Sequence, residues 1–405
     1  MRWPKTFNRV ATGSLAILLS SCTSIKAPKT LFITFAAPEK TFKSDTRQIR
    51  SFLDTYTKAF QRSNPETNIV YISYTYSQFY TQIEGDSKLS LGPDLIITNP
   101  GSADELLERD LTTTLPEQDY FDSIYSPTIQ SIAKTNAGYT FAPWLIDPQI
   151  ACFNKAKIET PPETAEELQE LSARGKKIGL ASNSTELIWT AGTQGAISEL
   201  STLGNTMTSR RPYPGIKAWL EWLQTAALYQ NISFHKDSRE LGTKLKNNEL
   251  DWVTCQGSQL EDLKLAMGDN LGVGALPNGT NSRAFPFFRI YGFSLGKNSS
   301  PTQRRMAMKF IRTDVNNIAQ RKLQLDNIGY LAANKNVSVP PESSRILSVL
   351  NTSFNEQSKS YQEERTGLSQ YLRQTPQLDR TIKDLINGYL DTDEVLRKIT
   401  TPQTE

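Results

Sequence analysis

The chain has 405 residues, 38% of them hydrophobic and 21% charged, which is typical of a folded protein of two domains or lobes and excludes a disordered chain. Its formal net charge is +3, but Arg2, Lys5 and Arg9 all lie at the N-terminus. Without them, 42 Lys plus Arg residues balance 42 Asp plus Glu residues. A neutral chain offers no electrostatic footprint for nucleic acid, so we expect no nucleic-acid partner.

The N-terminal segment has the layout of a bacterial export signal. The three positive residues precede a short apolar run, Val10 to Leu19, and about ten apolar residues are too few to span a bilayer. Leu19-Ser20-Ser21-Cys22 follows and resembles the bacterial lipobox, whose cysteine is acylated and becomes the new N-terminus. We therefore predict a signal peptide over 1–21, a lipid (palmitate) on Cys22, a lipidated tether over 22–29, and a location on the outer (periplasmic or extracellular) face of the cell membrane. An ordinary signal peptide with an incidental cysteine is the alternative.

Two cysteines remain beyond the predicted cleavage site, Cys152 and Cys255, and both lie in apolar, strand-like stretches. A free cysteine in such a place is a small buried hydrophobe, whereas an exported location also permits a disulfide, and the sequence leaves both open. Residue counts exclude two-histidine metal sites, because there is no Cys-x-x-Cys and His235 is the single histidine. We expect neither a metal nor a cofactor.

Apolar periodicity predicts short strands that alternate with longer helices. Strands are expected at 31–36, 69–74, 95–97, 139–142, 149–153, 177–180, 251–255, 271–275 and 290–294. Helices are expected at 49–60, 102–109, 161–174, 184–203 and 215–228, and over nearly all of the chain from residue 301 onward. This alternation predicts an α/β fold with parallel sheets covered by helices on both faces.

Three stretches of the chain carry a family resemblance. Gly92-Pro93-Asp94-Leu95-Ile96-Ile97 is a turn that leads into a buried strand, and 141–154 reads FAPWLIDPQIACFN. The third stretch, 257–310, contains Leu271-Gly-Val-Gly-Ala-Leu-Pro-Asn-Gly279. This run is not a dinucleotide-binding fingerprint, because proline and asparagine occur where the helix of such a motif begins. In this order the three resemble the bacterial extracellular solute-binding proteins of the maltose-binding type (family 1), the capture subunits of ABC importers.

The resemblance implies a two-lobe periplasmic-binding-protein fold of type II. Each lobe is expected to hold a mixed, mostly parallel sheet flanked by helices, and the lobes are expected to close like a hinge over a central cleft. We expect the first lobe to comprise 30–148 and 260–312. The second lobe is expected to comprise 149–259 and 313–405, including the C-terminal helices.

The resemblance also implies that strand ends and the crossing segment line the cleft. Asp147 lies in that segment, where sugar-binding relatives carry a carboxylate on the ligand; the alternative is a hinge carboxylate that caps a local turn. Trp144 either stacks on a ligand or fills the interface between the lobes. Asn99 follows the strand at 95–97, where sugar binders often have an aromatic residue, and this departure disfavours a maltodextrin-like ligand.

Residues after the strand at 177–180 are candidates in the second lobe. Thr185 and Trp189 belong to the start of the next helix, so a hydroxyl, an indole or backbone N–H groups there are expected to meet ligand oxygens. For Ser184 and Thr185 the alternative is helix capping, which needs no ligand.

Two further pairs of residues complete the candidate site. Gln256 and Gly257 resemble a family turn where backbone approaches the ligand closely, and Gln259 stands where relatives have a tryptophan. Arg289 and Tyr291 enter the strand at 290–294. Arg289 either pairs with the carboxylate of the crossing segment, binds an acidic group of the ligand, or is a solvated surface arginine.

The sequence thus predicts a monomeric binding protein without catalysis. It is expected to capture a small polar solute, with a sugar or polyol preferred, and to deliver it to an ABC-type permease in the membrane. A solute-sensing lipoprotein without transport shares the same features. A lipid-anchored surface hydrolase with paired carboxylates is the third class, although the chain has no Gly-x-Ser-x-Gly elbow.

Overall fold

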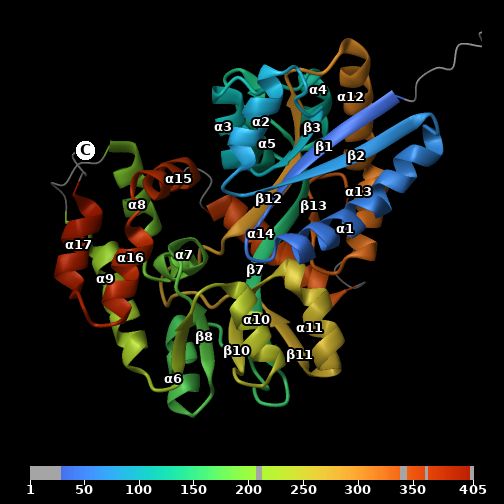
Figure 1. The fold of residues 1–405 in the computed structure, drawn as a ribbon. Helices are drawn as coiled ribbons and strands as arrows, with labels where there is room; N and C mark the ends of the chain where they lie inside the picture. The colour runs from blue at the N-terminus through green and yellow to red at the C-terminus, as the bar shows by residue number, and fades with distance from the viewer. Residues whose placement is uncertain (1–28, 207–211, 338–343, 361–363, 402–405) are drawn as a thin grey trace, which may run out of the picture.

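The computed structural model describes residues 29–206, 212–337, 344–360 and 364–401. The predicted signal peptide, Cys22 and nearly all of the predicted tether lie outside the described residues. Among the residues that the structure describes, no helix combines the length and the apolar character needed to cross a bilayer. The described chain forms an upper and a lower lobe that meet at the middle of the molecule (Figure 1).

Strand β7 (Ala142–Asn154) belongs to both lobes. The half that ends at Pro148 pairs antiparallel with β12 (Phe288–Gly296), and the half from Gln149 pairs antiparallel with β10 (Trp252–Gln256). All 13 residues of β7 are buried. This burial explains the apolar run in the sequence, because a strand covered on both faces has no solvent side to fill with polar residues. The lobes are therefore joined through one continuous strand.

The first lobe is built on the strand order β2-β1-β3-β12-β7. β1 runs parallel to β2 and β3, while β12 runs antiparallel to β3. α2 and α3 pack on one face of this sheet and α1 and α12 on the other. Besides β7 and β12, the strands are β1 (Lys29–Ala37), β2 (Thr67–Thr75), β3 (Leu95–Thr98), β4 (Thr112–Thr113), β5 (Lys134–Thr135), β6 (Gly138–Tyr139) and β13 (Leu331–Ala332). The helices are α1 (Phe42–Ser63), α2 (Phe79–Lys88), α3 (Pro100–Glu108), α4 (Gln118–Ile124), α5 (Pro127–Ala133), α12 (Pro301–Val315) and α13 (Asn317–Asp326).

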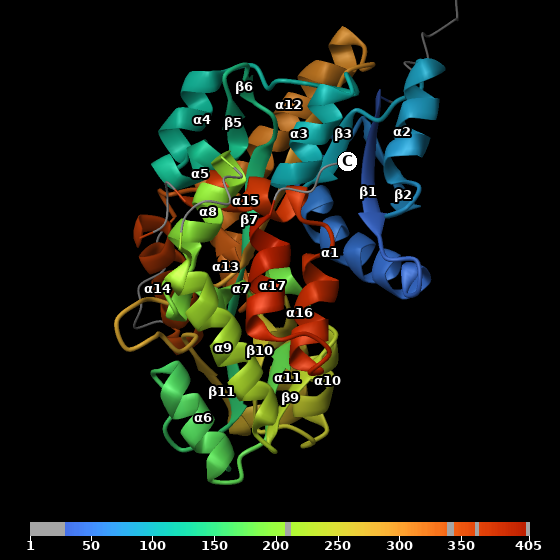
Figure 2. The same cartoon turned by 90° about the vertical axis from the view of Figure 1, so that its left-hand side faces the viewer.

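The second lobe continues the sheet in the order β7-β10-β8-β9, with β8 parallel to both neighbours. Its other strands are β8 (Ile178–Ala181), β9 (Ile232–His235) and β11 (Leu271–Gly274). Its helices are α6 (Ala165–Ala173), α7 (Ser184–Thr193), α8 (Ile197–Thr206), α9 (Pro214–Leu228), α10 (Ser238–Lys246), α11 (Leu260–Met267), α15 (Glu364–Gln374), α16 (Leu378–Ile386) and α17 (Thr392–Thr400), with short 3₁₀ turns η1 (Gly257–Gln259) and η2 (Gly268–Asn270). α14 (Arg345–Ser360) packs on β7, β11 and β13 near the junction. Figure 2 shows α16 and α17 on the outside of this lobe.

Strand pairing corrects the expected lobe boundaries, because the half of β7 with which a strand pairs sets its lobe. We expected 260–312 in the first lobe, but β11 pairs with the same half of β7 as β10 does. The chain therefore stays in the second lobe until β12 begins. Likewise, β13 pairs with Leu145 and Ile146 of the first half, so the chain beyond residue 313 first completes the first lobe.

The long helix expected at 184–203 is two helices, α7 and α8. Gly195, at φ 73, lies between them in a left-handed conformation that breaks the helical hydrogen-bond ladder. Trp219 and Trp222 are buried in the second lobe beside Trp189 and Trp252. These four indoles supply much of the apolar volume of that core.

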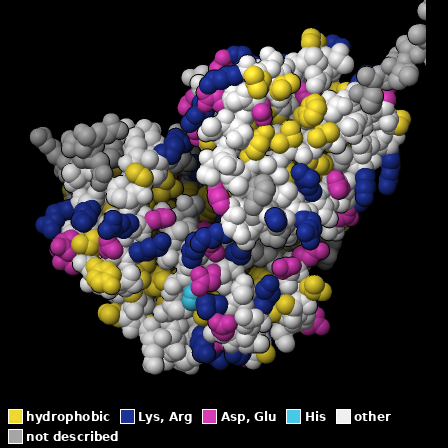
Figure 3. Space-filling model, viewed as in Figure 1, with side chains coloured by type: hydrophobic (Ala, Val, Ile, Leu, Met, Phe, Trp, Pro, Cys, Tyr) yellow, Lys and Arg dark blue, Asp and Glu magenta, His cyan; other side chains and the backbone are white. Residues whose placement is uncertain are grey.

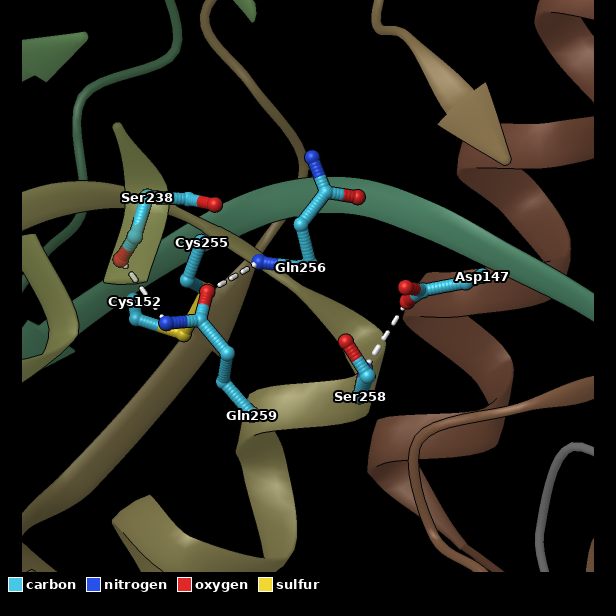
Figure 4. The surroundings of a disulfide bond; sticks show 7 residues. All are labelled: Asp147, Cys152, Ser238, Cys255, Gln256, Ser258 and Gln259. Atoms are coloured by element: carbon cyan, nitrogen blue, oxygen red, sulfur yellow. Dashed lines mark hydrogen bonds between the residues drawn. A yellow bond between two sulfur atoms is a disulfide. The ribbon is translucent and has the colours of Figure 1, made fainter. Parts of the chain in front are cut away.

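The two cysteines left open by the sequence form a disulfide. Cys152 in β7 and Cys255 in β10 are bonded, with their Cα atoms 5.9 Å apart, and both residues are fully buried (Figure 4). The bond closes a long loop, because the two cysteines are 103 positions apart in the sequence. It ties the strand shared by the lobes to the strand that ends at Gln256.

We expect removal of this bond to destabilise the protein. A Cys152→Ala/Cys255→Ala variant should lose roughly 2–5 kcal/mol of unfolding free energy, because a cross-link over a loop of this length restricts the unfolded chain. Chemical denaturation followed by circular dichroism measures the loss, and reduced wild-type protein controls for the volume removed with the sulfur atoms. Equal unfolding free energies in the oxidised wild type and the variant would show that the bond does not stabilise the fold.

Candidate functional site

The ends of six strands approach one another where the lobes meet. β1, β2 and β3 are parallel in the first lobe, and β8, β9 and β10 are parallel in the second, so each set ends at a single edge of its sheet. Arg239, which follows β9, donates a hydrogen bond of 3.3 Å to Thr41, which follows β1, so the two edges meet. The surface is hollowed between the lobes on the side of α8 and α15 (Figure 3). Ligands of α/β proteins bind outside such carboxyl ends.

One arginine joins two buried carboxylates at the centre of this edge. Arg289 of β12 donates from Nη2 to Glu186 Oε1 at 2.6 Å, and its Nη1 lies 4.0 Å from Asp147 Oδ2. The Glu186 and Asp147 side chains are almost fully buried, whereas one third of the Arg289 side chain is exposed. The backbone N–H of Ser258 also donates to Asp147 Oδ1 at 2.8 Å. Arg289 therefore pairs with both carboxylates and is not a solvated surface residue.

The pKa of Asp147 reflects this burial. Desolvation raises it to about 6, against the attraction of Arg289 and the hydrogen bonds from Ser258, which lower it. The carboxylate also holds the first turn of η1 through the Ser258 N–H. This contact is the turn cap that was one of the two sequence interpretations of Asp147.

A chain of hydrogen bonds extends from Glu186 into the second lobe. Glu186 accepts from the N–H of Ser238 at 2.6 Å and from its hydroxyl at 3.1 Å. The carbonyl of Ser238 accepts from Gln259 Nε2 at 2.7 Å, and Gln259 Oε1 accepts from the N–H of Gln256 at 2.8 Å (Figure 4). Gln259 thus uses its amide to hold two backbone segments together.

The side chain of Gln256 is unusual within this network. It is fully buried, and neither Oε1 nor Nε2 has a hydrogen-bond partner among the described residues. Figure 4 shows the amide pointing away from Gln259 and Ser258. A buried amide without partners costs about 1–3 kcal/mol, so a group that satisfies it has a free-energy advantage at this point.

Gly257 makes the close approach expected of it, but its neighbour is protein. A Cβ atom at Gly257 would lie 2.0 Å from the carbonyl oxygen of Gly329, which is in the segment between α13 and β13. A Cβ at Gly329 would likewise overlap the carbonyl of Gly257 at 1.8 Å. The two backbones touch only because both residues lack side chains, so this is a packing contact between the lobes.

Two of the predicted site residues lie in the cores instead. Trp189 has no exposed surface and packs against Trp222 and Trp252 in the second lobe. Trp144 is 2% exposed and packs with Tyr56 and Phe293 in the first lobe, so neither indole is available to a ligand. Trp189 was expected in the cleft because it follows a strand, and Trp144 was expected either there or in the lobe interface; position along the chain does not fix the direction of a side chain.

The other candidates lie at the edge where the lobes meet. Asn99 is exposed, and its side chain accepts from the N–H of Ser102 at the start of α3. Thr185 is half-buried in the first turn of α7, whose N-cap is Asn183, one residue earlier than the expected cap. Tyr291 is half-buried two residues along β12 from Arg289, and desolvation raises its pKa to about 12. Asp147, Gln256, Gly257, Arg289 and Tyr291 therefore gather at the junction, with Asn99 and Thr185 on helices that begin beside it.

Sequence reasoning missed one exposed residue at the end of a first-lobe strand. Tyr76 follows β2 and is 59% exposed, an unusually large exposure for an aromatic side chain. Its pKa is raised, first by desolvation, while Arg289 and Arg239 oppose the rise, so its hydroxyl lies within the field of both arginines. The available sequence signal was that Tyr76 lies two residues after the alternating strand 69–74, and strand ends are where cleft residues occur.

Comparison with known proteins agrees with this geometry. The family model of bacterial extracellular solute-binding proteins matches residues 43–313. The chain belongs to this family. A search of curated protein sequences found no match. The expectations of family and of a two-lobe α/β fold are thereby confirmed.

Solved structures of this solute-binding family share the fold. The GacH receptor of Streptomyces glaucescens, solved unliganded and with acarbose, has a TM-score of 0.72 at 13% identity over 92% of this chain and 97% of that chain. Maltose-bound MalE3 of T. maritima has a TM-score of 0.70 at 14% identity over 92% and 98%. MalE of Bdellovibrio bacteriovorus bound to maltotriose has a TM-score of 0.67 at 18% identity over 92% and 97%.

The raised pKa of Asp147 predicts a pH-dependent contribution to stability. The folded protein holds the proton to about pH 6, whereas the unfolded chain releases it near 3.8. The stabilising contribution is therefore full below pH 3.8 and is lost as the pH rises through 6. Asp147→Asn should gain unfolding free energy relative to the wild type as the pH increases from 4 to 7, as measured by urea denaturation. The exposed Asp119→Asn serves as control, and a parallel pH profile for wild type and Asp147→Asn would contradict the shift.

Proposed function

We propose that this solute-binding protein captures a small neutral solute rich in hydroxyl groups, a sugar or a polyol, between its lobes and delivers it to an ABC-type permease. The single observation that carries this proposal is that both arginines at the junction are already paired with carboxylates of the protein itself. Arg289 pairs with Glu186 and Asp147, and Arg239 pairs with Asp45. A solute that brings its own charge would have to disrupt these pairs, whereas hydroxyl groups add hydrogen bonds to them.

The ligands of the structural relatives support the same class of solute. Acarbose, maltose and maltotriose are bound by the three proteins compared above, and a Thermotoga lettingae binding protein of the same fold was solved with α-D-tagatose. Each of these is a neutral or weakly basic polyhydroxylated molecule. Tyr76 offers an exposed aromatic face, which suits the C–H patches of such rings.

We propose capture without catalysis. A hydrolase with paired carboxylates needs one free acid and one free base or nucleophile at the scissile bond. Here Glu186 accepts from Arg289 and twice from Ser238, and Asp147 caps η1, so both buried acids are committed to the protein itself. The sensing alternative shares the cleft and differs only in the partner that reads its closed state.

A panel of neutral sugars and polyols tests the proposed solute class. A ligand that binds only the folded state raises the melting temperature, by an amount that grows with its concentration above the Kd. We expect at least one member to raise the melting temperature of the wild type and a Tyr76→Ala variant to need a several-fold higher concentration. Tyr389→Ala, which removes a 77% exposed tyrosine after α16, is the matched control. Melting temperatures that respond only to ionic solutes would refute a neutral ligand.

Cys22 carries the proposed lipid anchor, with the tether 22–29 between lipid and fold. The oxidising compartment that an export signal implies agrees with the disulfide between Cys152 and Cys255. We expect Cys22→Ser to move the protein from the membrane fraction to the soluble fraction of the envelope, as seen by fractionation and immunoblotting. A Ser21→Ala variant keeps a small residue before the cysteine and should remain with the membrane. Persistent membrane association of Cys22→Ser would rule out lipidation as the anchor.

A further inference from the structure

The lobes are joined by a second charged contact away from the hinge strand. Arg239 is in the first turn of α10, in the second lobe, and Asp45 is in the first turn of α1, in the first lobe. Arg239 Nη2 lies 3.3 Å from Asp45 Oδ2, and its Nη1 donates to Thr41 Oγ1 at 3.3 Å. Thr41 in turn donates to Asp45 at 2.9 Å. The start of α1 lies directly above α10 (Figure 1), and charged side chains gather along this seam (Figure 3).

The position of Arg239 along its helix is unfavourable unless it has such a partner. A helix carries partial positive charge at its N-terminus, so a cation in the first turn is disfavoured and an anion is favoured. Asp45 therefore suits the first turn of α1, and Arg239 does not suit the first turn of α10. The contact across the seam compensates for this local cost, and it exists only while the two lobes are together.

This contact is mechanically connected to the hinge. Ser238, the residue before Arg239, is held by both of its hydrogen bonds to Glu186, and Glu186 is held by Arg289 of the first lobe. Each lobe thus supplies one arginine to a carboxylate of the other, and the start of α10 is common to both pairs. A rotation that separates the lobes moves this shared segment and strains both contacts at once.

We propose that Arg239 is a positioning residue that latches the lobes through Asp45 and Thr41 and so favours the closed form before any solute binds. Arg239 acts on the solute through the open-closed equilibrium: a latch that favours the closed, binding-competent form raises the apparent affinity in proportion to the fraction of closed molecules. The proposal builds on the solute-binding role, but the latch itself is measured without solute. The latch has the strength of an exposed ion pair, so it changes the ratio of closed to open molecules about two- to fivefold.

Distances between spin labels on the two lobes measure the latch directly. The full chain with Cys22→Ser carries labels at Glu108→Cys in α3 and Glu170→Cys in α6, both exposed, and keeps the native disulfide. In solute-free protein at low ionic strength, Arg239→Ala should shift the distance distribution toward the open form. High salt should shift the latched protein in the same direction and should leave Arg239→Ala nearly unchanged, because salt screens exposed pairs.

A double-mutant cycle separates the latch from a general loosening of the fold. Asp45→Asn should shift the distribution as Arg239→Ala does, and the double variant should add little, because both changes break one contact. Lys217→Ala, which breaks the exposed pair with Asp393 inside the second lobe, is the matched control and should leave the distances unchanged. Unchanged distances in Arg239→Ala and Asp45→Asn, or fully additive shifts, would overturn the latch. Either result leaves the melting-temperature test of solute binding unaffected.

Discussion

The pairing of Arg289 with two buried carboxylates is the interaction on which the junction of the lobes depends. The side chains of Glu186 and Asp147 are almost completely buried, and only Arg289 and a few hydrogen-bond donors replace the lost hydration of their carboxylates. Breaking a buried pair by removal of one partner typically costs about 3–5 kcal/mol, because the remaining charge is left uncompensated. The three groups come from α7, β7 and β12, so a movement of one lobe away from the other separates them and carries this free-energy cost.

The same cluster explains why the backbone around η1 is so confined. Asp147 holds Ser258, Gly257 touches Gly329, and the disulfide fixes Cys255 two residues before Gly257. The end of β10 is therefore tied to the shared strand by a covalent bond, to the first lobe by backbone contact, and to the hinge acid by a hydrogen bond. A segment held on three sides has little freedom to adapt, which places the unpartnered amide of Gln256 in a fixed position.

The sequence predicted the parts of this arrangement that depend on local pattern. Apolar runs located most strands, and the crossing segment predicted that Asp147 lies at the hinge. Side-chain direction was not accessible in the same way: Trp144 and Trp189 were candidates for the cleft, but their side chains are buried in the cores. Pairs such as Arg239 with Asp45, 194 positions apart, were also out of reach, because proximity across two lobes is a property of the assembled fold. Tyr76 was missed although its place after β2 was visible.

Gln259 shows how one residue changes what the cleft can offer. A tryptophan in its place would present a flat apolar face, but Gln259 donates a hydrogen bond to the carbonyl of Ser238 and accepts one from the N–H of Gln256. The start of α10 and the end of β10 are thereby joined, and the start of α10 is also the segment that Glu186 and Arg239 hold. At this position the second lobe therefore has a rigid polar framework. Such a framework suits a ligand recognised by hydrogen bonds, as in the proposal that a neutral sugar or polyol is captured here.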